Sequence, residues 1–395
     1  MRYESITDAR RLDAMIAELR GAPVIAFDTE FVSEHTYRPE LCLVQVAANG
    51  KLYVVDPYAV PDMTALWECL AAPGHFTLMH AGREELRFSW RAISRFPNEV
   101  YDVQIAAGFI GLEYPAAYST LVSRFARVNL AKGETRTDWR RRPLTPMQIE
   151  YALQDVVHLE ALSERLHAET ERLGRTDWVR DELDRWQQSI LLAETTEWWR
   201  RLPGIAGLNV RSLAIARELW RWREAEAERQ NIPARRLLRD DLLVELARRQ
   251  SSDPKRIRAV RGLEYRHLQK FLPIIADRIE AALHLPDDML PTRSERTARP
   301  PLNLVGQFLA TALGSICCEA RIAAPLVGSA EDVRDLVAFR LNLEPRPAEP
   351  PALAHGWRSE VVGRRMEDLL LGRSAVRIAD PLSEQPLAFL ECSDE

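Results

Sequence analysis

The hydrophobic pattern of this chain changes near residue 175, and that change limits the folds open to it. Before this point, short apolar runs alternate with amphipathic segments of helical period. Beyond it, the pattern is almost purely helical. Alternating strands and helices are typical of an α/β domain. We therefore predict one α/β domain, followed by all-α units.

The division into domains follows from length and from proline content. A chain of 395 residues is too long for one ordinary core. Strands are expected at 24–27, 41–47, 51–56, 76–80 and 101–103, and Asn49-Gly50 predicts a hairpin between the second and third of them. Prolines between 285 and 301 indicate a linker. The predicted units are 1–205, 206–288 and 302–395, with the linker at 289–301.

Composition narrows the class of protein. The chain is 46% hydrophobic and 28% charged, as soluble globular proteins are, and no apolar stretch reaches the roughly 18 residues that span a bilayer. We expect a cytoplasmic monomer without membrane contact. The five cysteines lack the spacing of a zinc site. The net charge of −5 argues against a nucleic-acid partner, but segments 124–142 and 235–270 are locally basic.

Asp28 and Glu30 end the first strong apolar run, which begins at Val24. Alternate residues of a strand point to the same face, so both carboxylates should lie side by side. Two acids so placed repel each other unless a cation lies between them. A divalent metal is the expected compensation, and chemistry on phosphate is the function that this pair favours.

Tyr151 and Asp155 are four residues apart in a predicted helix that begins with Pro146. A phenol and a carboxylate on one helix face can position a water and a metal. The alternative is a packed tyrosine beside a solvated aspartate. A third segment, 80–86, contains Glu84 and Glu85 at a predicted strand-to-helix junction, where these acids would serve either a site or the helix N-terminus.

Together these segments resemble the DEDD family of 3′–5′ exonucleases, and within it the ribonuclease D group. The resemblance covers residues 1–205 and rests on five segments in the family's order, at 27–31, 80–86, 101–107, 138–145 and 151–155. It implies a ribonuclease H-like exonuclease domain, with a mixed sheet and flanking helices. It also implies an enzyme that releases nucleoside 5′-monophosphates from the 3′ end of RNA, with tRNA precursors as expected substrates.

The same resemblance implies roles for individual residues. Two Mg²⁺ or Mn²⁺ ions would be held by Asp28, Glu30, Glu85 and Asp155, with Asp28 bridging the ions and Tyr151 orienting the attacking water. The family carries Asp where this chain has Glu85, which is one methylene longer. We expect activity to survive this difference. A non-catalytic RNA-binding protein with a degenerate nuclease domain remains the alternative, as does an exonuclease acting on DNA.

The segment 208–284 resembles the helical HRDC module that follows the nuclease domain in ribonuclease D, and its place in the chain suggests a second such module at 302–395. A basic face could neutralise phosphates without reading sequence. Trp220 is expected in the core, and Trp222 is left open between packing and base stacking. Near the exonuclease site, the expected phosphate contacts are Arg140, Arg141 and Arg142; in the module they are Arg235, Arg236, Arg239, Lys255, Arg256, Arg258 and Arg266.

Overall fold

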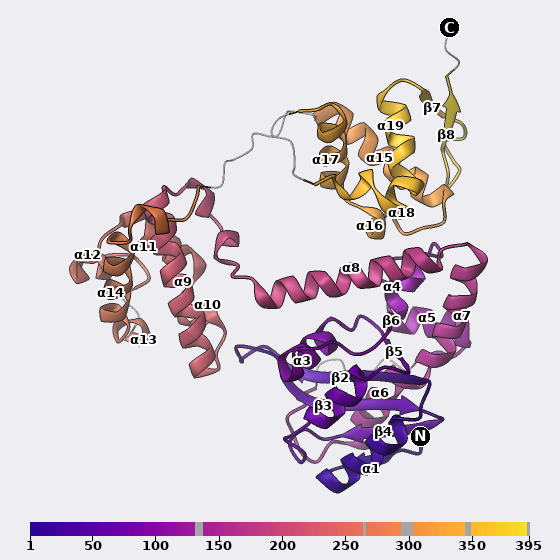
Figure 1. The fold of residues 1–395 in the computed structure, drawn as a ribbon, viewed down its shortest axis with the longest axis horizontal. Helices are drawn as coiled ribbons and strands as arrows, with labels where there is room; N and C mark the ends of the chain where they lie inside the picture. Colours follow the sequence, from indigo (N-terminus) through magenta and orange to yellow (C-terminus); the bar gives the residue numbers. More distant parts are fainter. Residues whose placement is uncertain (131–136, 264–265, 294–302, 344–348, 393–395) are drawn as a thin grey trace.

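The computed structural model describes residues 1–130, 137–263, 266–293, 303–343 and 349–392 (Figure 1). The Arg266 side chain and residues 294–301 of the predicted linker lie outside the described part. An N-terminal α/β domain comes first, and the long helix α8 (Thr176–Thr195) leads from it to a middle helical module. A C-terminal module follows and lies back against the first domain. The predicted fold class is confirmed, whereas the exact domain boundaries stay a prediction.

Six strands form one sheet in the order β1-β4-β3-β2-β5-β6. Strand β3 runs antiparallel to both β2 and β4, and the remaining neighbours are parallel. The hairpin predicted at Asn49-Gly50 joins β3 to β4, with positive φ at both residues. The bounds are β1 Glu4–Ile6, β2 Val24–Val32, β3 Glu40–Ala48, β4 Lys51–Val55, β5 Phe76–Met79 and β6 Val100–Asp102.

Two strands differ from their sequence predictions. Strand β1 was not expected, because three residues beside a helix cap carry too little pattern; it forms by parallel pairing with β4. Strand β2 runs on through Val32, so Asp28 and Glu30 lie inside the strand and not at its end. Asp28 pairs with Gln45 of β3, and Glu30 pairs with Leu43. Pairing with β3 therefore fixes the two acids from one side, whereas the pairing of β2 with β5 ends at Ala26.

Helices cover both faces of the sheet. Ile25 and Phe27 of β2 face a core shared with α1 (Ala9–Leu19), α2 (Thr64–Ala71) and α3 (Arg83–Ile93). The side chains of Ala26, Asp28 and Glu30 point to the other face. That face is covered by α4 Val103–Gly108, α5 Tyr118–Ala126, α6 Pro146–Val157 and α7 Leu159–Arg172.

The middle module is helical, as predicted, and has its own core. Trp222 is buried there with its ring edge-on to Phe271, and Trp220 packs against the same core while remaining half-buried. Trp222 is therefore a packing residue. The helices are α9 Val210–Gln230, α10 Ala234–Leu237, α11 Asp240–Arg249, α12 Pro254–Arg258, α13 Arg266–Gln269 and α14 Leu272–Leu283.

The C-terminal module shares one continuous hydrophobic core with the N-terminal domain. Trp357 stacks on Trp178 of α8 and meets Phe109 edge-on. The module is helical except for a two-stranded hairpin of β7 (Ser374–Ile378) and β8 (Leu387–Glu391), which was not predicted. Its helices are α15 Asn303–Glu319, α16 Ala324–Val327, α17 Ala330–Arg340, α18 Gly356–Arg358 and α19 Arg364–Leu370. Among the described residues, no helix has the length and apolar character needed to cross a bilayer.

Candidate active site

Helix α6 brings Tyr151 and Asp155 over the acids of β2. Pro146 occupies its first turn, and Thr145 and Gln148 form a reciprocal capping box, with backbone-to-side-chain distances of 2.9 and 3.2 Å. The helix packs on β2 and β3 through apolar residues such as Leu153. A helix that begins at this cap and packs on these strands presents Tyr151 and Asp155, four residues apart, to the sheet, as the sequence predicted.

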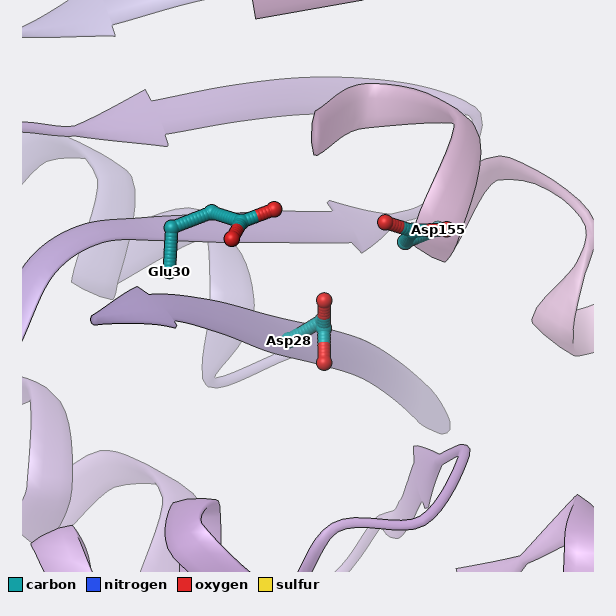
Figure 2. A group of neighbouring side chains, drawn as sticks. All are labelled: Asp28, Glu30 and Asp155. Carbon is teal, nitrogen blue, oxygen red and sulfur yellow. The ribbon is translucent and has the colours of Figure 1, made fainter. Parts of the chain in front are cut away.

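Asp28, Glu30 and Asp155 form one group of carboxylates, each partly buried (Figure 2). One oxygen of each lies within 4.8 Å of the corresponding oxygens of the other two. Figure 2 shows the three side chains converging from β2 and α6 on a common space. The predicted pairing of the two strand acids and their closure by Asp155 are thus present in the structure.

Burial and mutual repulsion make these acids unusually weak. Burial first, and then the charges of Asp155 and Glu85, raise the pKa of Glu30 to about 8. Burial raises the pKa of Asp155 to about 7. The pKa of Asp28 also lies well above its usual value, because of burial and of the neighbouring acids. The group therefore holds protons at neutral pH unless another cation replaces them.

Gln45 supports Asp28 from the neighbouring strand, a role that the sequence reading missed. Its Nε2 donates to Asp28 Oδ2 at 3.0 Å, which leaves the amide oxygen buried without a partner in the described part of the chain. The available signal was a lone amide inside the apolar run 41–47. The hydrogen bond orients one Asp28 oxygen and leaves the other for a different ligand.

The donor set fits a divalent cation. No ion pair joins Asp28, Glu30 or Asp155 to a basic side chain among the described residues. Three carboxylates without such a partner supply the hard oxygen ligands that Mg²⁺ and Mn²⁺ prefer. A cation bound there would remove the repulsion that raises their pKa values.

Glu85 approaches from the other side of β2. It lies in the first turn of α3, is buried, and accepts a hydrogen bond from the Thr29 hydroxyl. Because successive side chains of a strand point to opposite faces, Thr29 points away from Asp28 and Glu30. The group of three acids therefore does not include Glu85. Burial raises the pKa of Glu85 to about 7, and its charge in turn raises the pKa values of Asp28 and Glu30. Its part in metal binding stays a prediction.

Tyr151 is half-buried beside the acids, with its ring 6.2 Å from that of Trp139. Burial and the charges of Asp155, Glu30 and Asp28 raise the pKa of its hydroxyl. The phenol therefore stays protonated at neutral pH. It can donate or accept a hydrogen bond, but it cannot serve as a base there.

Asp102, in the predicted segment 101–107, is a further buried acid whose own role was not predicted from the sequence. Asp102 ends β6 and accepts hydrogen bonds from the backbone N–H groups of Gly82 and Gln104, at 2.9 and 2.8 Å. It thus caps α4 and ties the start of α3 to the sheet. His80, in the predicted segment 80–86, bonds through Nε2 to the carbonyl of Ala116 at 2.9 Å.

The arginines before α6 are not equivalent. Arg142 donates to both oxygens of Asp56, at 2.7 and 2.8 Å, and lies over the Tyr58 ring, so it ties the segment to the sheet. Arg140 pairs with Asp138 but also lines a cavity of about 460 Å³ that contains Glu30. Arg141 is largely exposed. Of the three, Arg140 is the one the structure brings to the acids.

The basic residues predicted in the middle module fall into two sets. Arg235 pairs with Asp240 and lines a cavity together with Ser33 of the N-terminal domain, and Arg236 bonds to His35 of that domain, so both lie toward it. Arg239 pairs with Asp241. The other set is exposed on α12 and consists of Lys255, Arg256 and Arg258. Phosphate contact by either set stays a prediction.

Comparison with known proteins places this geometry in context. The family model described as 3′–5′ exonuclease matches residues 3–171, and that of the HRDC domain matches residues 212–279. The chain is 36% identical to ribonuclease D of Gluconacetobacter diazotrophicus, over 93% of each chain. It is 30% identical to ribonuclease D of Escherichia coli, covering 94% of this chain and 99% of that one.

The fold agrees with these sequence similarities. The crystal structure of Escherichia coli ribonuclease D, described as an exoribonuclease involved in structured RNA processing, superposes with a TM-score of 0.81. It covers 94% of this chain and 99% of that chain at 29% identity. All three units therefore have a counterpart in one known architecture.

Proposed function

This chain belongs to the ribonuclease D family of 3′–5′ exoribonucleases, and we propose that its acids act as the metal-dependent centre of that reaction. The observation that carries the proposal is the group Asp28, Glu30 and Asp155, which is partly buried and has no basic partner among the described residues. Exonucleases of this kind use divalent metal. The proposal adds that two ions, Mg²⁺ or Mn²⁺, are held here.

Each residue has a defined task in the proposal. Bound metal supplies positive charge that lowers the pKa of water and stabilises charge on the scissile phosphate. Asp28, Glu30 and Asp155 hold that charge in place, and Gln45 fixes the orientation of Asp28. Tyr151, which keeps its proton, orients the attacking water. Glu85 adds negative charge from the far side of β2.

The proposed substrate is a structured RNA with a free single-stranded 3′ end, such as a tRNA precursor, processed by a cytoplasmic monomer. Support comes from the Escherichia coli enzyme, which is described as acting in structured RNA processing. The exposed basic residues of α12 suit contact with a folded RNA body at a distance from the cut.

The test is shortening of a 5′-labelled single-stranded RNA by the full chain with Mn²⁺, with nucleoside 5′-monophosphate measured as product. Asp28→Asn keeps the shape of the side chain but removes a charge, so we expect activity to fall about 1000-fold or more. Asp13→Asn, on the exposed side of α1, is the matched control and should leave the rate unchanged.

The competing functions give different results in the same assay. A degenerate nuclease domain would bind the RNA but release no product above the Asp28→Asn background. A DNA exonuclease would shorten a DNA strand of the same sequence faster than the RNA. Shortening that proceeds equally well in Asp28→Asn would show that these acids are not the centre.

A further inference from the structure

A second cavity lies between the N-terminal domain and the middle module, beyond the acids. Its volume is about 510 Å³. The loop after β2 contributes Ser33 and Tyr37, the segment after α8 contributes Trp198 and Arg201, and α9 contributes Trp220. No single domain forms this cavity, so it exists only when the two are assembled.

The cavity is adjacent to the one that contains the acids. Ser33 lines both this cavity and the cavity of about 460 Å³ that includes Glu30 and Arg140. Ser33 follows Glu30 by three residues in the chain. The two cavities therefore meet at Ser33, and an RNA whose 3′ end lies at Glu30 can continue past Ser33 into the second cavity.

The lining combines aromatic rings with one available cation. The Arg201 guanidinium lies 3.6 Å from the centre of the Trp198 ring, and Arg201 has no ion pair among the described residues. The other cations of the cavity are neutralised, since Arg223 and Arg235 both pair with Asp240. Arg201 is thus the group that remains free to meet a phosphate.

Trp220 supplies the second aromatic group. It is half-buried, packs against the module's core on one side, and lines the cavity. Single-stranded nucleic acids bind where an aromatic ring lies beside an arginine, because any base can stack on the ring and its phosphate can contact the guanidinium. The ligand class that this lining suits is a single-stranded nucleotide, without preference for its base.

The cavity wall is held in place before any ligand arrives. The Tyr37 hydroxyl donates to Glu224 and its backbone N–H to Asn231, each at 3.2 Å. Arg38 forms an ion pair of 2.9 Å with Glu228. These contacts hold the loop after β2 against α9, so the loop loses less conformational entropy when RNA binds.

We propose that this cavity is a subsite for a nucleotide upstream of the RNA 3′ end, with its base against Trp220 and its phosphate at Arg201. The inference rests on the proposed exonuclease function, and it assigns to the junction of the two domains a share of substrate binding. It predicts that affinity depends on RNA length, because only an RNA that extends beyond the acids can occupy the second cavity.

The test compares Arg201→Ala with Arg200→Ala. Both arginines lie over a tryptophan, but Arg200 covers Trp199 and bonds to the Thr292 carbonyl outside this cavity. With an RNA of about twelve nucleotides, Arg201→Ala should raise KM about 10-fold at unchanged kcat, and Arg200→Ala should not. With a dinucleotide, neither variant should change KM. Trp220→Leu should resemble Arg201→Ala.

Binding of the same two RNAs, measured by fluorescence anisotropy in an Asp28→Asn background, tests the subsite without requiring catalysis. An equal effect of Arg201→Ala and Arg200→Ala on the longer RNA would overturn the proposal. So would an equal effect of Arg201→Ala on both RNA lengths. An unsubstituted protein that degrades no RNA would instead contradict the exonuclease function, while length-dependent binding lost in Arg201→Ala would still support the subsite.

Discussion

At the scale of single residues, Glu85 has two properties that substitutions can separate: its negative charge and the length of its side chain. Its carboxylate accepts from Thr29 on one face of β2 and acts electrostatically on Asp28 and Glu30 on the other. Gln keeps the length and can still accept from Thr29, but it has no charge. Asp keeps the charge and is one methylene shorter. The two substitutions therefore distinguish a structural hydrogen bond from a contribution to the metal centre.

We expect Glu85→Asp to keep kcat/KM within about threefold and Glu85→Gln to lower it at least about 10-fold, with weaker Mn²⁺ binding by calorimetry. Glu84→Gln, in the same turn but paired with Arg87, is the control and should change little. Full activity in Glu85→Gln would reduce Glu85 to a hydrogen-bond partner of Thr29. A large loss in Glu85→Asp would show that the site is adapted to the longer side chain.

The acids also make stability depend on pH and metal together. Glu30 and Asp155 have folded-state pKa values of about 8 and 7, well above those of carboxyls in an unfolded chain. Between pH about 4 and 8 the folded state holds more protons, so the stability from these groups falls as pH rises. Below this window both states are protonated, and above it both are ionised.

Metal must displace those protons, so Mn²⁺ should bind better as pH rises through this range. We expect the metal-free melting temperature to fall between pH about 6 and 8.5 and the increase produced by Mn²⁺ to be larger at the higher pH. Differential scanning fluorimetry measures both. The increase should disappear in Asp28→Asn. A larger increase at pH 6 would contradict the assignment of these acids as ligands.

At the scale of elements, local patterns predicted what local geometry determines. Strand alternation placed Asp28 and Glu30 on one face, and helical spacing placed Tyr151 and Asp155 together. The apolar run before Asp28 did not show that β2 continues to Val32, because that extension depends on pairing with β3. Acids are weak strand formers, so propensity alone ends the strand too early.

Contacts between residues far apart in the sequence could not be predicted from local patterns, because they too depend on how the elements pair and pack. Gln45 meets Asp28 because the register of β2 and β3 places them opposite each other, and register is not visible in either strand alone. Glu85 lies behind β2 because α3 covers the opposite face. The motif at 80–86 predicted its nearness to the site but not the side from which it approaches.

At the scale of the whole molecule, the C-terminal module is joined to the catalytic domain by a buried cation. Arg175 donates to the carbonyls of Phe109 in one unit and of Ala320 and Arg321, just after α15, in the other. Burial lowers the pKa of Arg175 from its usual value. Its charge lies at the negative end of α15, which favours this position. Nearby, Arg358 pairs with Glu182 across the same contact.

We expect Arg175→Met to destabilise this contact by about 2–3 kcal/mol, because it removes these hydrogen bonds and leaves buried carbonyl groups without a donor. Amide hydrogen exchange should become faster at residues 320–323, where Ala323 donates to the Gly108 carbonyl, and in α4. Arg180→Met, an exposed substitution on α8, the helix that Arg175 precedes, is the control and should leave exchange unchanged. Equal exchange in both variants would show that the aromatic contacts of Trp357 hold the module without Arg175.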